Sequence, residues 1–264
     1  MKDKKLSPGL SAYVFLCCVF LAAPILIVIP SAFSAGSNLA FPPQGFSLKW
    51  FQNILVWPGF LPAARLSASL AIVSTLTSLV LGTLAAYGLV RFKYKQRAVL
   101  LNTFLIPLTI PSIVLAVGIS MLLTPLGLMR TFTGLLIAHV LLTLPYVVRT
   151  VTSALLELDR SLTEAASTLG ARRWTSFWKI EFPLLMPGLL AASVFSFIIS
   201  FDEFTVSLFV VGPGLMTLPI EIYNYTEFSL DPTVAAISTV LILISALSIF
   251  AVERLVGLGK QFGK

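Results

Sequence analysis

The chain has 264 residues, of which 57% are hydrophobic and 11% are charged, and its mean hydropathy is +0.96. Soluble domains carry about 25% charged residues, so this composition excludes a water-soluble enzyme, and its apolar content excludes a disordered chain. We therefore expect an all-α integral membrane protein with a single domain, residues 1–264. Two adjacent cysteines, Cys17 and Cys18, and a single histidine, His139, predict no disulfide framework and no metal site.

Six apolar stretches predict six transmembrane helices, because a helix needs about 20 apolar residues to cross the hydrocarbon. The first follows several lysines, as in a signal peptide, but it is longer than the usual core of about 7–15 residues. We therefore expect it to be a retained anchor helix. The core spans cover about residues 66–252. The six stretches are residues 10–33, 66–90, 98–129, 131–148, 182–201 and 233–252.

Several residues in the second to fourth stretches suggest how the helices pack and bend. Gly82 and Gly88 would permit close helix packing. His139 is expected to be a hydrogen-bonded packing residue rather than a proton relay. Prolines are expected to kink the third and fourth spans. These prolines are Pro107, Pro111, Pro125 and Pro145.

Basic residues are distributed unevenly between the two sides of the six spans. With the N-terminus inside, 15 of the 18 lysines and arginines fall on the inner side, and only Lys49, Arg65 and Arg130 on the outer side. This positive-inside bias predicts that both termini are cytoplasmic, and it explains most of the net charge of +7 without nucleic acid. The inner residues are Lys2, Lys4, Lys5, Arg91, Lys93, Lys95, Arg97, Arg149, Arg160, Arg172, Arg173, Lys179, Arg254, Lys260 and Lys264.

The inner loop between the fourth and fifth spans, residues 149–181, has a helical pattern of its own. Ser161 and Glu164 have the spacing of a capping box, which starts a helix. Gly170 stands where a helix stop favours a residue tolerant of positive φ, and Pro183 suits the first turn of the next span. One apolar helix face combines Leu162, Ala165, Ala166 and Leu169.

Residues 171–180 form a second amphipathic stretch, in which aromatic residues alternate with basic ones. From the helical pattern alone, two interpretations of the loop remain open. The first is an interfacial helix that lies on lipid headgroups. The second is a stiff helix outside the bilayer, whose alanines allow the close approach of another protein.

The spacing of this loop resembles the EAA loop of permease subunits in binding-protein-dependent ABC importers. The family pattern is Glu-Ala-Ala, three residues, Gly, nine residues, Ile, one residue and Leu-Pro, and Phe182 in place of leucine is the one departure. The resemblance extends over most of the chain. It implies the type I importer permease fold with a cytoplasmic coupling helix. The matching residues are Glu164, Ala165, Ala166, Gly170, Ile180 and Pro183.

In that family the coupling helix inserts into a cleft of an ATPase subunit, so the resemblance implies that an ATPase dimer docks on this loop. The chain lacks a Gly-x-x-x-x-Gly-Lys-Ser/Thr loop, so we expect a non-catalytic subunit that binds neither ATP nor another cofactor. Glu164 would either cap its own helix or pair with a basic group of the ATPase. The implied docking residues are Glu164, Ala165, Ala166, Leu169, Gly170, Ile180 and Pro183.

The resemblance also implies the remaining partners and the location. A second permease subunit, expected to be a different chain, would complete the pore, and an extracytoplasmic solute-binding protein would deliver the cargo. The membrane would be a bacterial inner membrane, with lipid around the spans and both termini in the cytoplasm.

A narrower resemblance links the fifth span and the loop after it to the spermidine/putrescine branch of these permeases. It implies a cationic polyamine as the cargo. Permeases for other small amines, phosphonates and inorganic ions have related stretches, so these cargoes remain alternatives. The resemblance rests on Ser200, Phe201, Asp202, Glu203, Phe204, Gly212, Pro213, Leu218, Pro219, Ile222 and Tyr223.

The candidate substrate pathway consists of Asp202, Glu203, Phe204 and Tyr223. The two acids follow a helix of about 27 Å, at 1.5 Å per residue, which places them near the outer side of the membrane. They would draw a cation inward, or they are two solvated acids at a helix end. Aromatic faces attract ammonium groups, but aromatic residues also belong to the interfacial belt or the core. The aromatic candidates are Phe204, Phe209, Tyr223 and Tyr225.

Two functions of other classes also remain open at this point. A secondary transporter would need no ATPase, and it usually has more spans and more acids within the membrane. A membrane-embedded enzyme is disfavoured, because the sequence shows no clustered His, Asp, Ser or Cys residues.

Overall fold

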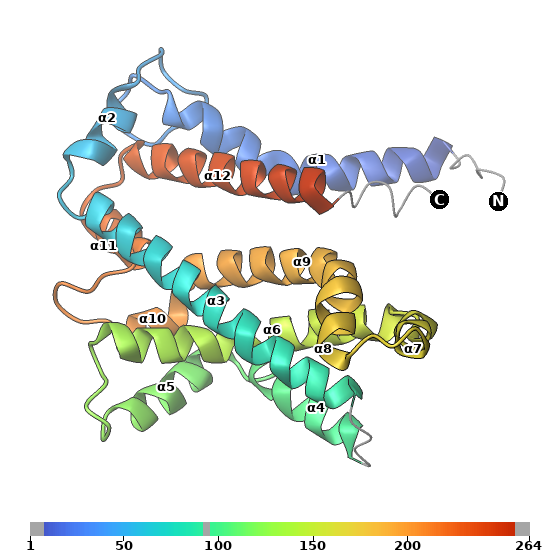
Figure 1. Cartoon of the computed structure of the whole chain (residues 1–264). Coiled ribbons are helices and arrows are strands. Elements are labelled where there is room, and N and C mark those ends of the chain that lie inside the picture. The colour runs from blue at the N-terminus through green and yellow to red at the C-terminus, as the bar shows by residue number, and fades with distance from the viewer. Residues whose placement is uncertain (1–7, 92–95, 257–264) are drawn as a thin grey trace. The chain divides into compact units, whose positions relative to one another are not determined.

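The computed structural model describes residues 8–91 and 96–256, and within these ranges it is helical, without a strand (Figure 1). The described residues divide into two compact units. The first unit takes in residues 8–61 and 224–244, and the second takes in residues 62–91, 96–223 and 245–256.

In the first unit, the end of α1 (Pro8–Ala32) packs against the start of α12 (Thr233–Val256). The short helix α2 (Lys49–Val56) begins at Lys49, one of the three basic residues expected on the outer side. The end of α11 (Leu218–Phe228) also packs in this unit. Its Tyr225 is 3% exposed and donates a hydrogen bond of 2.8 Å to Asp231. The apolar cluster consists of Ala32, Ala235 and Ala236 with Val28, Phe33, Trp50, Phe51 and Ile54.

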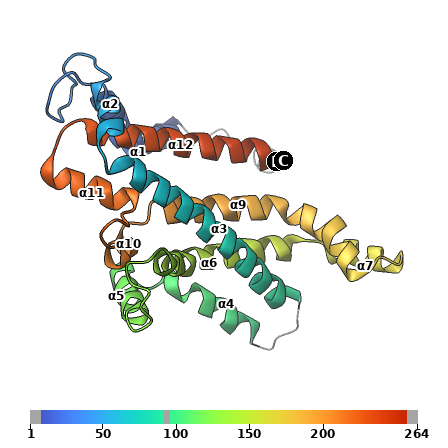
Figure 2. The same cartoon turned by 60° about the vertical axis from the view of Figure 1, so that its left-hand side comes forward.

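The second unit is built around two long helices that run side by side, α6 and α9 (Figure 2). Helices α8, η2 and α9 form one continuous helix, Arg173–Phe201, in which η2 is a π-helical turn. Its elements are α3 (Phe60–Arg91), α4 (Arg97–Leu105), η1 (Ile106–Leu108), α5 (Ser112–Leu123), α6 (Phe132–Glu157), α7 (Arg160–Thr168), α8 (Arg173–Ser176), η2 (Phe177–Glu181), α9 (Phe182–Phe201), α10 (Thr205–Val210) and most of α11.

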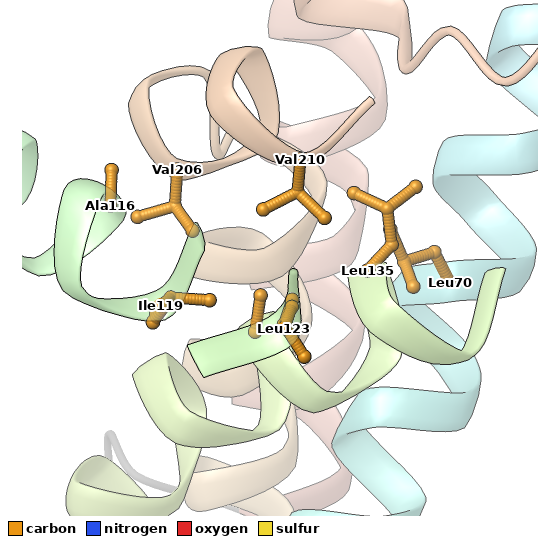
Figure 3. Packing of buried hydrophobic residues seen from close by; sticks show 8 residues of the cluster. Leu70, Ala116, Ile119, Leu123, Leu135, Val206 and Val210 are labelled. Carbon is orange, nitrogen blue, oxygen red and sulfur yellow. The ribbon is translucent and has the colours of Figure 1, made fainter. Parts of the chain in front are cut away.

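Two apolar clusters hold the second unit together. In the first, Val206 and Val210 of α10 lie over Ile119 and Leu123 of α5 (Figure 3). The second joins α3, α6 and α9, and in it Gly82 allows close packing, because an added Cβ would lie 2.9 Å from the Cβ of Val147. Gly88 has no such neighbour, so the expectation of close packing there was wrong. The second cluster consists of Ala86, Val90, Val147, Val151, Leu155, Leu185 and Ala192.

Four helices of the described chain are long and apolar enough to cross a membrane, or five if a bent pair counts as one span. The bent pair comprises α4–η1 and α5, which meet at 97°. The apolar stretch Thr233–Leu247 of α12 is shorter than these spans. The four helices are Gly9–Ala32, Phe60–Arg91, Phe132–Glu157 and Arg173–Phe201.

The structure corrects two expected boundaries. The third stretch is not one continuous helix: Pro107 lies in η1 and Pro111 precedes α5, and neither has a backbone N–H to continue an α-helix. The fourth span does not end at Val148. Helix α6 continues through Pro145 and the exposed Arg149 to Glu157, because a charged residue on an open helix face need not end the helix.

His139 lies in a chain of hydrogen bonds at the centre of the second unit. Its Nδ1 lies 2.8 Å from the hydroxyl of Ser200, and its Nε2 lies 3.0 Å from that of Ser207. Ser200 also lies 2.9 Å from the hydroxyl of Ser74 on α3. The expectation of a hydrogen-bonded packing residue is thus confirmed, and the chain of bonds joins α3, α6, α9 and α10.

We predict that Ser200→Ala lowers the free energy of unfolding by about 1–3 kcal/mol, because His139 and Ser74 would each lose a buried partner. Thermal unfolding of the purified protein in detergent would measure this loss. Ser193→Ala is the matched control on the same helix, because the Ser193 hydroxyl bonds only the carbonyl of Leu190 in its own helix. Equal stability of the two variants would contradict the prediction.

Candidate functional site

The coupling segment, residues 158–172, contains α7 and lies beyond the ends of α6 and α9 in the second unit (Figure 2). Helix α7 begins at Arg160, and the Asp159 side chain caps it by accepting the Ser161 N–H at 2.9 Å. The capping box expected from Ser161 and Glu164 was therefore wrong, because an equally good acceptor stands two residues before Ser161. The same N–H lowers the pKa of the exposed Asp159 carboxyl.

Gly170 ends the helix as the sequence predicts. Its φ is +81°, the left-handed region that favours glycine. The Ala171 N–H donates to the carbonyl of Ala166 at 2.9 Å, and the Gly170 N–H donates to that of Ser167 at 3.0 Å. This pair of bonds is a Schellman motif, which satisfies carbonyls that the helix leaves unpaired. Both ends of α7 are therefore fixed by local bonds.

The predicted apolar face of α7 is largely uncovered. Leu169 is 88% exposed, Leu162 is 46% exposed and Ala165 is also exposed, whereas Ala166 is buried. Glu164 is exposed beside them. A short helix fixed at both ends thus presents leucine and alanine side chains that nothing else in the described chain covers.

Ile180 and Pro183 do not lie on α7. Ile180 is half-buried in η2, and Pro183 is the second residue of α9. Since proline has no N–H and its ring clashes with the carbonyl four residues earlier, Pro183 accounts for the π-helical turn that precedes it. The structure thus brings together five of the seven expected docking residues at α7 and places these two in the following helix.

An ion pair that the sequence analysis missed lies next to this segment. The Arg91 guanidinium, at the end of α3, lies 2.8 Å from the carboxylate of Glu181, the last residue of η2. Their side chains are 18% and 8% exposed. The Tyr87 ring packs against both Arg91 and Phe177. A lone acid just before an apolar span, after a loop rich in cations, is the pattern that could have revealed the pair.

The expected substrate-pathway residues are only partly brought together. Phe204 and Tyr223 are in contact, with ring centroids 5.3 Å apart. Asp202 is exposed at the end of α9. Glu203 is half-buried and accepts the Val206 N–H at 2.8 Å, so it caps the start of α10. Burial raises the pKa of the Glu203 carboxyl, although this hydrogen bond favours its charged form.

Two further aromatic candidates are packing residues. Tyr225 is buried in the first unit, where its ring centroid lies 4.9 Å from that of Trp57. Phe209 packs against the first cluster of the second unit. Burial therefore removes Tyr225 from the candidates that could stack on an ammonium group.

The described residues contain no group of three or more His, Cys, Asp or Glu side chains that could hold a metal ion. Two features remain. One is an uncovered helix outside the spans, and the other is a group of acidic and aromatic residues near the end of α9. The uncovered helix suits the docking of another protein, and the acidic and aromatic group suits the passage of a solute.

We predict that Gly170→Ala loosens the end of α7, because alanine at a φ of +81° is strained by roughly 1–2 kcal/mol. Hydrogen exchange should become faster at the amides of residues 169–171 and stay unchanged in α6 and α9. Gly170→Asn should show a smaller effect, because asparagine tolerates this conformation better. An added Cβ meets no atom within 4 Å, so a clash would not explain the result. Unchanged exchange in the alanine variant would contradict the prediction.

Comparison with solved structures supports the fold. A bacterial ABC transporter involved in the import of alginate aligns with a TM-score of 0.66 and 16% identity, and the alignment covers 99% of this chain and 100% of that one. The MetNI methionine ABC transporter aligns with a TM-score of 0.62 and 20% identity, over 77% of this chain and 97% of that one.

Comparison with known sequences gives closer similarity. The chain is 34% identical to the spermidine/putrescine transport system permease protein PotC of Escherichia coli, over 88% of each chain. It is 31% identical to the putrescine transport system permease protein PotI of the same species, over 89% of this chain and 86% of that protein. Residues 78–258 match the family described as the inner membrane component of binding-protein-dependent transport systems. The chain therefore belongs to this family of inner membrane transport components.

Proposed function

We propose that the chain is a permease subunit of an ATP-driven importer that carries a polyamine, putrescine or spermidine, across a bacterial inner membrane. The observation that carries this proposal is the uncovered face of α7, a helix outside the spans whose two ends are fixed by local hydrogen bonds. The similarity to PotC and PotI supports the polyamine as cargo.

The partner of α7 is an ATPase subunit. The sequence has no phosphate-binding Gly-x-x-x-x-Gly-Lys-Ser/Thr loop, so a separate dimer must bind ATP. Burying a leucine side chain such as Leu169 gains about 1.5–3 kcal/mol. Glu164 no longer serves as a capping residue in this arrangement, which leaves it available to a basic group of the ATPase. Ile180 and Pro183 support the surface from the following helix.

Six spans with both termini in the cytoplasm complete the proposal. The bent pair α4–α5 supplies the third span. The 24 residues of α12 rise about 36 Å, which exceeds the hydrocarbon thickness of about 30 Å. The orientation rests on the basic residues of the inner segments. Seven of these lie outside the described residues: Lys2, Lys4, Lys5, Lys93, Lys95, Lys260 and Lys264.

The remaining partners follow from the family. The chain, as one permease domain of residues 1–264, pairs with a second and different permease subunit, and an extracytoplasmic solute-binding protein supplies the cargo. The alternative cargoes are another small amine, a phosphonate or an inorganic ion, and the phosphonate is supported by 29% identity to the putative 2-aminoethylphosphonate transport system permease protein PhnV of Salmonella typhimurium. Uptake of radiolabelled putrescine, spermidine and 2-aminoethylphosphonate by the complete importer would distinguish these cargoes.

We predict that Leu169→Asp weakens ATPase association at least about tenfold, since a loss of 1.4 kcal/mol of binding is already tenfold. The side chain is 88% exposed, so folding should be unaffected. Co-purification of the ATPase from solubilised membranes measures the effect, and uptake should fall with it. Gly170→Asp should likewise leave the protein in the membrane and abolish uptake.

The matched control for this experiment is Leu230→Asp, an equally apolar residue that is 74% exposed on the side expected to be extracytoplasmic. Full ATPase recovery with the Leu169 variant would refute the docking role of α7. An unmutated complex that contains no ATPase would instead favour a secondary transporter.

We predict that Asp202→Asn combined with Glu203→Gln lowers polyamine uptake several-fold while ATPase association is retained. Glutamine keeps an oxygen that can accept the Val206 N–H, so the start of α10 should survive. Glu227→Gln, which changes another exposed acid, is the control and should transport normally. Unchanged uptake by the double variant would identify the two acids as surface residues only.

A further inference from the structure

The coupling segment is joined to the spans unequally. Leu158 and Asp159 connect α7 to α6, and residues 169–172 connect it to the helix Arg173–Phe201. Helix α3 does not adjoin this segment in the sequence. A movement of α7 therefore reaches α6 and α9 through the chain, but it reaches α3 only through side-chain contacts.

The connection from α7 to α9 passes through a segment in which the regular α-helical hydrogen bonding is interrupted. The five residues of η2 form a π-helical turn, and Pro183 follows two residues after its end. A proline removes one backbone hydrogen bond from the helix, and helices bend preferentially at such positions. Without further support, the helix would flex at η2 when α7 moves, and α9 would not follow.

The ion pair between Arg91 and Glu181 lies at this interruption. Glu181 is the last residue of η2, it is only 6% exposed, and the guanidinium of Arg91 holds one of its oxygens at 2.8 Å. Tyr87 and Phe177 add a ring contact, with centroids 5.6 Å apart, between the same two elements. The pair thus ties the end of α3 to the turn at which the coupling helix would otherwise bend.

The pair is poorly suited to a role in stability alone. Both charged side chains are largely withdrawn from water, and a buried ion pair is weak support for stability because the cost of desolvating the charges offsets their attraction. The second apolar cluster already holds α3 against α6 and α9 through Ala86, Val90 and Leu185. What the apolar cluster does not provide is a contact at η2 itself, and the ion pair provides one there.

We propose that Arg91 and Glu181 are positioning residues that couple the movement of α7 to α3 and α9 together. This inference rests on the proposed function, because it assumes that an ATPase moves α7. When the pair is intact, η2 is braced and the displacement of α7 moves the spans as one body. When the pair is broken, η2 bends, so ATP is hydrolysed with little transport.

The test is the ratio of putrescine transported to ATP hydrolysed by the complete importer in proteoliposomes. Glu181→Gln and Arg91→Gln should each lower this ratio at least tenfold, while complex yield and ATP hydrolysis remain above half of the unmutated values. The double variant Arg91→Glu with Glu181→Arg should restore most of the ratio. Arg149→Gln, which changes an exposed cation on α6, is the control and should leave the ratio unchanged.

A ratio that stays normal in the single variants would overturn the inference. So would a parallel loss of yield, hydrolysis and transport, because that result describes a purely structural pair. If the swapped double variant is not recovered, Arg91→Lys decides: an intermediate ratio supports the inference, and a ratio equal to that of Arg91→Gln overturns it. An unmutated complex that lacks an ATPase would refute the proposed function itself, which keeps the two failures distinct.

Discussion

A peptide group inside the hydrocarbon has no water to bond, so each backbone N–H and C=O must find a partner within the protein. This constraint makes the described chain helical and decides where its helices can break. The break between α4 and α5 falls at Pro107 and Pro111, which have no N–H to satisfy, and the Thr109 hydroxyl donates to the carbonyl of Ile106 at 2.8 Å. The π-helical turn before Pro183 follows the same logic, because the helix shifts its bonding pattern where proline cannot donate.

The same shortage of water governs the polar side chains. His139 and Ser200 bond one another and two further serines, so four elements of the second unit are joined through hydroxyl and imidazole groups. One of these elements is α10, whose first turn Glu203 caps. The acids expected to meet the cargo, Asp202 and Glu203, therefore lie in sequence between two members of this hydrogen-bonded centre, Ser200 and Ser207.

Outside the spans the constraint is relaxed, and the chain uses this freedom to build a helix that needs no core. Asp159 and Gly170 define the two ends of α7 through local bonds, so the apolar face of the helix does not have to be buried to keep its shape. Leu169 is consequently available to a partner. The Arg91–Glu181 pair connects η2, which follows this exposed element in the chain, to α3.

The all-helical membrane class, the family and the stop of α7 at Gly170 could all be predicted from the sequence, because apolar length, motif spacing and glycine at positive φ are local properties. Prediction from the sequence failed where local signals compete: Asp159 displaced Ser161 as the cap, Arg149 did not end α6, and the stretch of residues 98–129 broke in two. The burial of Tyr225, the contact of Phe204 with Tyr223 and the ion pair of Arg91 with Glu181 became visible only in the folded chain. These contacts join residues far apart in sequence or fix which face is covered, and no local pattern encodes either property.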